Sequence, residues 1–269
     1  VLVPTLSGAV FAETLEALHK TLGRNGYLMM LGESGYQDAD EEVLIENVIR
    51  RRPDGIVLTR VVTSPTARER LRASGIAVVE TWDTTAEPID MLIGFSHADV
   101  GRTVARYLQS LGRRQPGLII GNDPRATRRG QAFSAALEGL HVLRPGFEQV
   151  PTVRVPAPAS LGAGRQGIGE LLKQCPNLDA VFCSTDMVAL GVLIECQQRG
   201  IRVPEDLAVV GFGDLAMAPH SAPSLTTVRI DGTQIGQRAA HLVMRRAEGL
   251  PPIEPVLDIG FSLVRRDSA

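Results

Sequence analysis

The sequence predicts an α/β protein of two lobes, each a doubly wound parallel sheet covered by helices. Short apolar runs alternate with longer amphipathic segments along the whole chain, as in consecutive βαβ units. The apolar runs are continuous, as expected for strands that are buried on both faces. The chain has 269 residues, which suits two lobes of similar size, and the pattern restarts near residues 113–116.

The first part of the chain alternates regularly between the two kinds of segment. In the first predicted helix, Leu15, Leu18 and Leu22 recur at spacings of three and four, which places them on one face. The helix that follows Pro65 is expected to end at Ser74-Gly75, a common stop signal. The predicted strands are 1–4, 27–31, 55–59, 76–80 and 91–95, and the predicted helices are 9–23, 41–50, 65–73 and 99–111.

The second part repeats this alternation. The predicted strands are 117–121, 148–155, 180–184, 207–211, 226–230 and 256–261, and the predicted helices are 125–137, 161–173, 186–199 and 233–246. The final segments are expected to complete both lobes through chain crossings. We therefore predict an N-terminal lobe of residues 1–113 plus about 230–249, and a C-terminal lobe of residues 114–229 plus about 250–269. Ligands of open α/β sheets bind beyond the carboxyl ends of the strands, so a ligand cleft is expected between the lobes.

Composition excludes several classes of protein. The net charge of -2 and the pI near 6.3 disfavour nucleic-acid binding by this stretch alone, since a protein that binds the phosphate backbone normally has a basic excess. No apolar run is long enough for a membrane span, and no secretory signal opens the sequence. Cys175, Cys183 and Cys196 are odd in number and fit no zinc spacing, which favours a reducing cytoplasm over a disulfide framework.

Catalytic signatures are also missing from the sequence. It contains neither the G-x-S-x-G elbow of hydrolases nor the G-x-x-x-x-G-K-[ST] loop of nucleotide hydrolysis. The histidines do not have metal-ligand spacing; they are His19, His97, His141, His220 and His241. We therefore expect no catalytic residues, no metal and no cofactor, and an enzyme is the least favoured class.

Two runs near the end of the chain resemble a known family. Residues 203–214 read V-P-E-D-L-A-V-V-G-F-G-D, and residues 223–228 read P-S-L-T-T-V. Together they resemble the effector-binding core of the lactose/galactose repressor (LacI/GalR) family of bacterial transcription regulators. Further matches are the runs 53–58 and 179–191 and the arrangement of Arg129 before Ala132 and Phe133. Details that resemble the gluconate-type repressors lie at 80–83, 90–97, 211–214 and 258–261.

The resemblance implies a periplasmic-binding-protein-like core that binds a small sugar or a gluconate-like sugar acid in the cleft and forms a homodimer. It also implies cytoplasmic regulation of transcription, in which the effector modulates operator binding. Operator DNA is contacted in this family by an N-terminal helix-turn-helix domain. Since Val1 already lies in an apolar run, we expect that domain to precede the present stretch.

An alternative is a periplasmic solute-binding protein that feeds sugar to an ABC transporter. It would share the fold, but it requires a secretory signal. The paired runs at 203–214 and 223–228 and the odd number of cysteines argue against it. An enzyme on a doubly wound fold is a third class.

Arg129 is the first candidate ligand-binding residue. A sugar acid calls for arginine, because the guanidinium fork matches a carboxylate. The resemblance aligns Arg129 with the family's ligand-binding arginine, and the competing explanation is a surface residue beside Arg125 and Arg128. His97 and Asp99 follow the strand that ends at residue 95, where the resemblance places polar pocket residues. Asp99 is also a suitable helix N-cap.

Three further candidates follow later strands. Thr185 and Asp186 stand where the family has Asn-Asp, so a hydroxyl would replace an amide, while Asp186 is also a suitable helix N-cap. Gly213 stands where many relatives have a ligand-binding aspartate, and here the carboxylate comes at Asp214. Removal of one anion from the pocket would suit an anionic ligand, although Asp214 could instead face solvent.

The remaining candidates lie in the first lobe. Trp82 is the only tryptophan and follows a predicted strand, where it could stack on a ligand or cover the edge of the lobe. Phe11 begins the first predicted helix, where the family has apolar ligand contacts, and core packing is the competing explanation. Arg60 ends the third predicted strand and could supply a second cation.

Overall fold

The computed structural model describes residues 1–140 and 149–269. It confirms the predicted class, because the chain forms two α/β units that each contain a six-stranded sheet. Unit 1 comprises Val1–Ser96 and Asp231–Gly260, and unit 2 comprises His97–Ile230 and Phe261–Ala269. The chain therefore passes between the units three times, at 96/97, 230/231 and 260/261.

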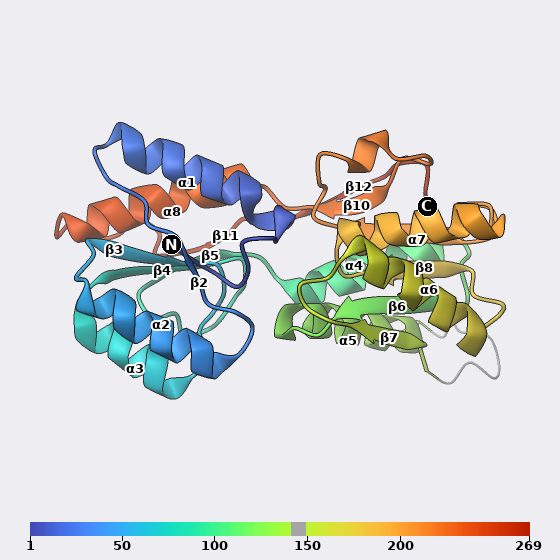
Figure 1. Cartoon of the computed structure of the whole chain (residues 1–269), viewed down its shortest axis with the longest axis horizontal. Helices are drawn as coiled ribbons and strands as arrows, with labels where there is room; N and C mark the ends of the chain where they lie inside the picture. The colour runs from blue at the N-terminus through green and yellow to red at the C-terminus, as the bar shows by residue number, and fades with distance from the viewer. Residues whose placement is uncertain (141–148) are drawn as a thin grey trace. The chain divides into compact units, whose positions relative to one another are not determined.

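Unit 1 is built on an all-parallel sheet with the strand order β11-β5-β4-β3-β1-β2. In Figure 1, α1 and α8 lie on one face of this sheet, and α2 and α3 lie on the other. The strands are β1 (Leu2–Val3), β2 (Gly32–Glu33), β3 (Gly55–Leu58), β4 (Ala77–Thr81), β5 (Met91–Gly94) and β11 (Val256–Asp258). The helices are the 3-10 turn η1 (Ala9–Phe11), α1 (Ala12–Arg24), α2 (Asp38–Arg50), α3 (Pro65–Ser74) and α8 (Gly232–Ala247).

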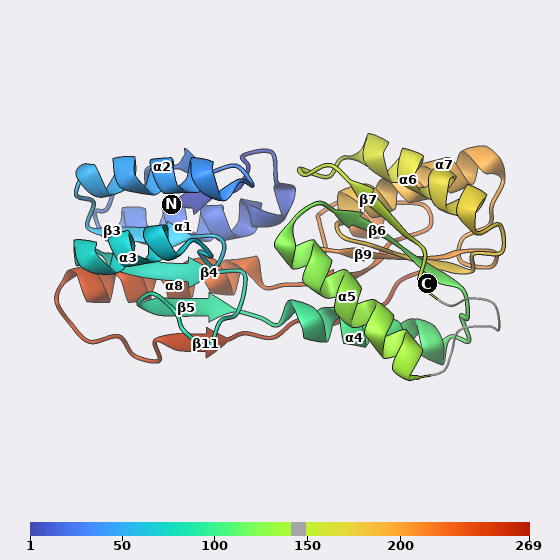
Figure 2. The ribbon, with the colours of Figure 1, turned by 90° about the horizontal axis from the view of Figure 1, so that it is seen from below.

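Unit 2 repeats this arrangement with the order β12-β10-β9-β8-β6-β7, in which only β12 runs antiparallel among the described strands. Figure 2 shows α6 and α7 on one side of the strands, and α4 and α5 on the other. The strands are β6 (Pro116–Gly121), β7 (Thr152–Val155), β8 (Ala180–Cys183), β9 (Ala208–Phe212), β10 (Thr226–Arg229) and β12 (Ser262–Val264). The helices are α4 (His97–Ser110), α5 (Pro124–Gly139), α6 (Leu161–Gln174), α7 (Asp186–Arg199) and the 3-10 turn η2 (Ala218–His220).

The division into units differs from the predicted boundaries in two places. The helix α4 was expected in the N-terminal lobe but belongs to unit 2, because it packs closely on α5. A Cβ atom on Gly101 of α4 would lie 2.2 Å from the carbonyl oxygen of Arg129, so the glycine permits this close approach. The segment 250–260 was expected in the C-terminal lobe, but β11 pairs with β5 in unit 1.

The strand predicted at 27–31 is also displaced, since β2 is found at Gly32–Glu33. The reason is its position at the edge of the sheet, where β1 is its only neighbour. The pairing register joins Leu2 to Gly32 and Val3 to Glu33. This register gives the residues before Gly32 no partner in a neighbouring strand, and Leu28 is 89% exposed.

Most other elements lie close to their predicted ranges because their ends carry local signals. The helix α3 begins with a hydrogen bond from the backbone N–H of Ala67 to the Ser64 side chain and ends at Gly75, which is left-handed at φ 69°. The predicted strand 148–155 contains β7, but Glu148, like His141, lies outside the described residues. The last predicted strand, 256–261, is divided into β11 and β12, one in each unit. Among the described residues, no helix is long and apolar enough to cross a membrane.

Candidate functional site

The candidate site lies in unit 2, where the parallel strands end. Arg129 is in the second turn of α5 and is only 4% exposed, so it is not a surface arginine. Its Nη2 atom donates a hydrogen bond to the backbone carbonyl of Ser184, directly after β8, over 2.9 Å. Its Nη1 atom lies 2.9 Å from Nδ1 of His97, the first residue of α4. Three elements therefore hold one buried cation.

The contact with Arg129 also determines the tautomer of His97. A guanidinium group has only donors, so Nδ1 of His97 must accept this hydrogen bond. The imidazole is then neutral, and its proton is on Nε2. His97 is 3% exposed. Arg129 therefore supplies a cation, and the neutral ring of His97 supplies an N–H donor at Nε2. These two groups together suit a ligand that is rich in hydrogen-bond acceptors.

Phe212 completes this group from β9. The Cζ atom of Arg129 lies over the ring of Phe212, 4.0 Å from its centroid, which is a close cation–π contact. The ring centroid of His97 lies 6.2 Å from that of Phe212. Phe212 was not predicted as a site residue, although it is an aromatic residue that ends a buried strand and directly precedes Gly213.

Asp186 is not the N-cap of α7. The residue that caps α7 is Thr185, whose Oγ1 accepts a hydrogen bond from the backbone N–H of Val188, so the prediction that Asp186 is a cap is wrong. The buried carboxylate of Asp186 instead accepts hydrogen bonds from Thr227 Oγ1, at 2.5 Å, and from the backbone N–H of Leu215, at 2.7 Å. Burial raises the pKa of Asp186 to about 6, and these two hydrogen bonds oppose the rise.

Asp214 does not face solvent, because its side chain is only 2% exposed. Its carboxylate pairs with Arg229 Nε at 2.5 Å and with Arg266 Nη2 at 2.6 Å. Gly213, immediately before it, has φ 127°, a conformation that favours glycine. The carboxylate thus anchors the loop that carries Gly213. These ion pairs account for the burial of Asp214, and its contact with a ligand stays a prediction.

Asp99 is exposed on the first turn of α4. Its Oδ1 atom accepts a hydrogen bond from Arg102 Nη2 at 2.7 Å, and its side chain is 53% exposed. It is the third residue of the helix, which begins at His97, so Asp99 is not the N-cap. Its acidic charge near the helix N-terminus is favourable for the helix dipole.

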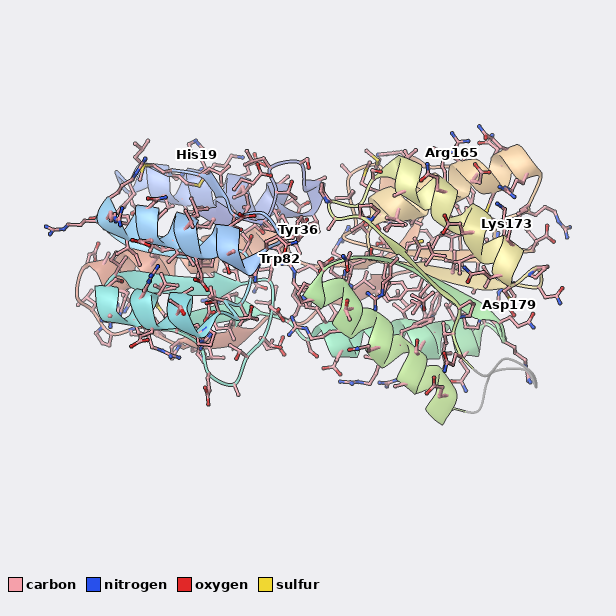
Figure 3. All side chains as sticks on the ribbon, turned by 60° about the horizontal axis from the view of Figure 1, so that its bottom comes forward. His19, Tyr36, Trp82, Arg165, Lys173 and Asp179 are labelled. Carbon is pink, nitrogen blue, oxygen red and sulfur yellow. The ribbon has the colours of Figure 1, made fainter. Side chains whose placement is uncertain are left out.

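The aromatic candidates of unit 1 come together in its core. Trp82 is 2% exposed, and its ring packs edge-on with Phe11 and Phe95, with centroids 5.2 Å and 5.9 Å away. Figure 3 shows Trp82 and Tyr36 at the same end of unit 1, each beyond the end of a strand. Phe11 ends η1 and is 3% exposed, so both rings are packed in the interior, and a ligand contact of either ring stays a prediction.

Trp82 is also fixed by a chain of hydrogen bonds. Its Nε1 atom donates to Thr14 Oγ1 over 3.1 Å, and Thr14 Oγ1 in turn donates to the backbone carbonyl of Gly232 over 2.9 Å. The backbone of Trp82 is left-handed, with φ 66°, which is unusual for a bulky residue. The chain after it passes so close to Gly94 that a Cβ there would lie 1.7 Å from the carbonyl oxygen of Asp83.

Arg60 lies in unit 1 and follows β3. Its Nε atom is 3.3 Å from Oε1 of Glu41 on α2, and the Glu41 side chain is almost fully buried. The partner explains why an arginine is placed here, since a buried carboxylate requires a compensating charge. The structure therefore groups His97 with Arg129 and Phe11 with Trp82, and it places Arg60 in a separate ion pair.

Two further features concern metal sites and cavities among the residues that the structure describes. Within residues 1–140 and 149–269, no group of three or more His, Cys, Asp or Glu side chains is arranged to hold a metal ion. Unit 1 does contain a cavity of about 1170 Å³, lined by residues such as Tyr27, Leu44 and Met244. It includes Val1 and Gly55 at the starts of β1 and β3, and so lies at the amino ends of the strands, away from Trp82 and Arg60.

The comparison with protein families gives an independent result. The model of a family described as periplasmic binding protein-like domain matches residues 105–269. Among curated proteins, the HTH-type transcriptional regulator GntR of Pseudomonas aeruginosa is 35% identical over the whole chain, which spans 77% of that relative. The GntR regulator of Escherichia coli is 29% identical over 98% of this chain, and the match covers 78% of that regulator.

Solved structures of transcriptional regulators are also similar to this chain. The structure of the transcription regulator GntR from Chromobacterium violaceum is 33% identical, with a TM-score of 0.92, and the match covers 99% of this chain and 97% of the other. A LacI family transcriptional regulator from Silicibacter pomeroyi is 29% identical, with a TM-score of 0.89 and the same coverage.

Proposed function

Because the chain belongs to the LacI family of transcriptional regulators, of which it forms the effector-binding core, we propose that its effector is a small sugar acid of the gluconate type. In this proposal the effector binds at the strand ends of unit 2 and changes the affinity of the longer protein for operator DNA. The relatives reported above are transcriptional regulators, which favours this function over a solute-binding protein or an enzyme.

The observation that carries the proposal is the buried Arg129. Arg129 is 4% exposed, and its hydrogen bonds to His97 and to the backbone carbonyl of Ser184 hold its guanidinium in place at the strand ends of unit 2. A carboxylate ligand would match the fork of donors that this guanidinium presents at the strand ends. The Nε2–H of His97 would donate to a hydroxyl oxygen of the same ligand.

The other candidate residues have different roles in this proposal. The hydroxyl of Thr185 follows β8 and would contact a ligand hydroxyl. The predicted ligand contacts of Asp186 and Asp214 would add to the hydrogen bonds and ion pairs that their carboxylates already make. Phe11, Trp82 and Arg60 would act through the structure of unit 1, and Asp99 through the first turn of α4.

The regulatory part of the proposal concerns the intact protein. A homodimer in the cytoplasm would bind a two-fold symmetric operator, and the effector would act by binding the DNA-competent state and the DNA-free state with different affinity. Such a difference is required for any allosteric response, whether the effector is an inducer or a corepressor.

Operator binding by the full-length regulator tests this function. The experiment measures the dissociation constant for its operator, with gluconate and with the neutral polyol sorbitol at the same concentration. We expect gluconate to change operator affinity at least tenfold and sorbitol to have little effect, since typical allosteric couplings are about 1–3 kcal/mol. An unchanged affinity with gluconate and with related sugar acids would rule out the proposal.

A further inference from the structure

The guanidinium of Arg129 is held in two different ways. Its hydrogen bonds to His97 and Ser184 run along N–H bonds and therefore lie near the plane of the group. These two bonds locate its edges. The ring of Phe212, 4.0 Å from Cζ, lies against the face and opposes tilting of the plane about the line between the two acceptors.

The backbone is held in place both at Phe212 and directly after it. It ends β9 and is paired in register with Val228 of β10. Directly after it, the backbone N–H of Gly213 donates to the carbonyl of Val228 over 2.8 Å, and Asp214 is anchored by two arginines. The backbone that carries the ring is therefore held in place, and the ring itself is buried at 4% exposure, so it gives the guanidinium a packed surface to lie against.

We infer that Phe212 is a positioning residue for carboxylate recognition, which it serves by setting the plane of the Arg129 guanidinium. The inference rests on the proposed function, in which Arg129 binds the carboxylate of a sugar acid. A two-point contact between a guanidinium and a carboxylate requires the two planes to be aligned. The aromatic face supplies that alignment and also stabilises the cation, whereas an aliphatic side chain of similar bulk supplies only apolar contact.

The test is a calorimetric titration of the chain with gluconate. Phe212→Leu removes the aromatic face and keeps an apolar side chain, and Phe212→Tyr keeps the face. We expect Phe212→Leu to weaken gluconate binding about tenfold, as is reasonable for a partly desolvated cation–π contact, and Phe212→Tyr to restore affinity to within about threefold of the wild type. The matched control is Phe182→Leu, which removes a buried ring of β8 that packs on Phe133. It is expected to lower the unfolding midpoint with little effect on affinity.

The outcomes separate the inference from the proposed function. Gluconate binding by the wild type with unchanged affinity in Phe212→Leu overturns the inference alone. The same holds if Phe212→Tyr binds as weakly as Phe212→Leu, because the loss would then not depend on the aromatic face. A wild-type chain that binds neither gluconate nor any related sugar acid overturns the proposed function, and the inference with it.

Discussion

The Nη1 atom of Arg129 donates a hydrogen bond to Nδ1 of His97 over 2.9 Å, and both side chains are buried. The two residues lie on different helices of unit 2, since His97 is the first residue of α4 and Arg129 is in the second turn of α5. Close packing of these helices at Gly101 brings the two side chains together. The contact thus links helix packing to the chemistry of the candidate site.

Replacement of Arg129 by lysine should weaken gluconate binding by roughly 2 kcal/mol or more, because an ammonium group cannot match a carboxylate at two points. Calorimetric titration with gluconate measures the change. Arg128→Lys, one position earlier on the same helix and exposed, is the matched control and should bind like the wild type. Equal affinities for both variants would show that Arg129 does not contact the carboxylate.

The pKa of Asp186 predicts a specific dependence of stability on pH. Burial raises this pKa to about 6, above the value of about 3.9 expected in the unfolded chain, so the folded chain binds the proton more tightly. The contribution to the free energy of unfolding is therefore highest below about pH 4 and falls as the pH rises through 6, by roughly 3 kcal/mol in total.

Asp186→Asn should remove this part of the pH dependence. The amide can accept from Leu215 N–H and donate to Thr227 Oγ1, so both contacts are kept without a charge. Urea unfolding between pH 4.5 and 7.5 should show the variant gaining stability relative to the wild type as the pH rises. Parallel curves for the two proteins would contradict the assignment.

Arg266→Gln should destabilise unit 2 by about 2–4 kcal/mol, because it removes one of the two cations that pair with the buried carboxylate of Asp214. Urea denaturation measures the loss. Arg202→Gln breaks an exposed ion pair with Asp206 and should cost less than about 1 kcal/mol. If the two variants lose similar stability, the buried pair has no special role in anchoring the Gly213 loop.

Thr14→Val should lower the stability of unit 1 by about 1–3 kcal/mol, because it leaves the buried Nε1–H of Trp82 and the carbonyl of Gly232 without this hydroxyl. Since Trp82 is the only tryptophan, its emission spectrum should shift as well. Thr21→Val, in a less buried position on α1, is the control and should leave both quantities nearly unchanged. An unshifted spectrum in Thr14→Val would contradict the hydrogen-bond relay.

The alternation of strands and helices was predictable from the sequence because strand burial and helix ends leave local signals. The helix α7, for example, occupies 186–199 as predicted, between Thr185 and the left-handed Gly200. The division between the units was not predictable in the same way. No local sequence signal shows which of the two sheets α4 covers. Its assignment to unit 2 depends on packing against α5, which is a contact between segments separated in the sequence.

The candidate site shows the same contrast. The sequence pointed to Arg129 and His97 as separate polar residues at strand ends, but it could not show that they form a pair. Arg266 was missed because it lies far along the chain from Asp214 and gives no local signal. Glu41 was missed for a similar reason, since a glutamate on a helix is ordinarily exposed, and only the fold buries it against Arg60.

A crystal structure of the chain grown with gluconate tests the central claim most directly. We expect density for the ligand at the strand ends of unit 2, with its carboxylate accepting hydrogen bonds from the Arg129 guanidinium and a hydroxyl near Nε2 of His97. Gluconate bound with its carboxylate away from Arg129 would contradict the claim, and so would its absence at saturating concentration.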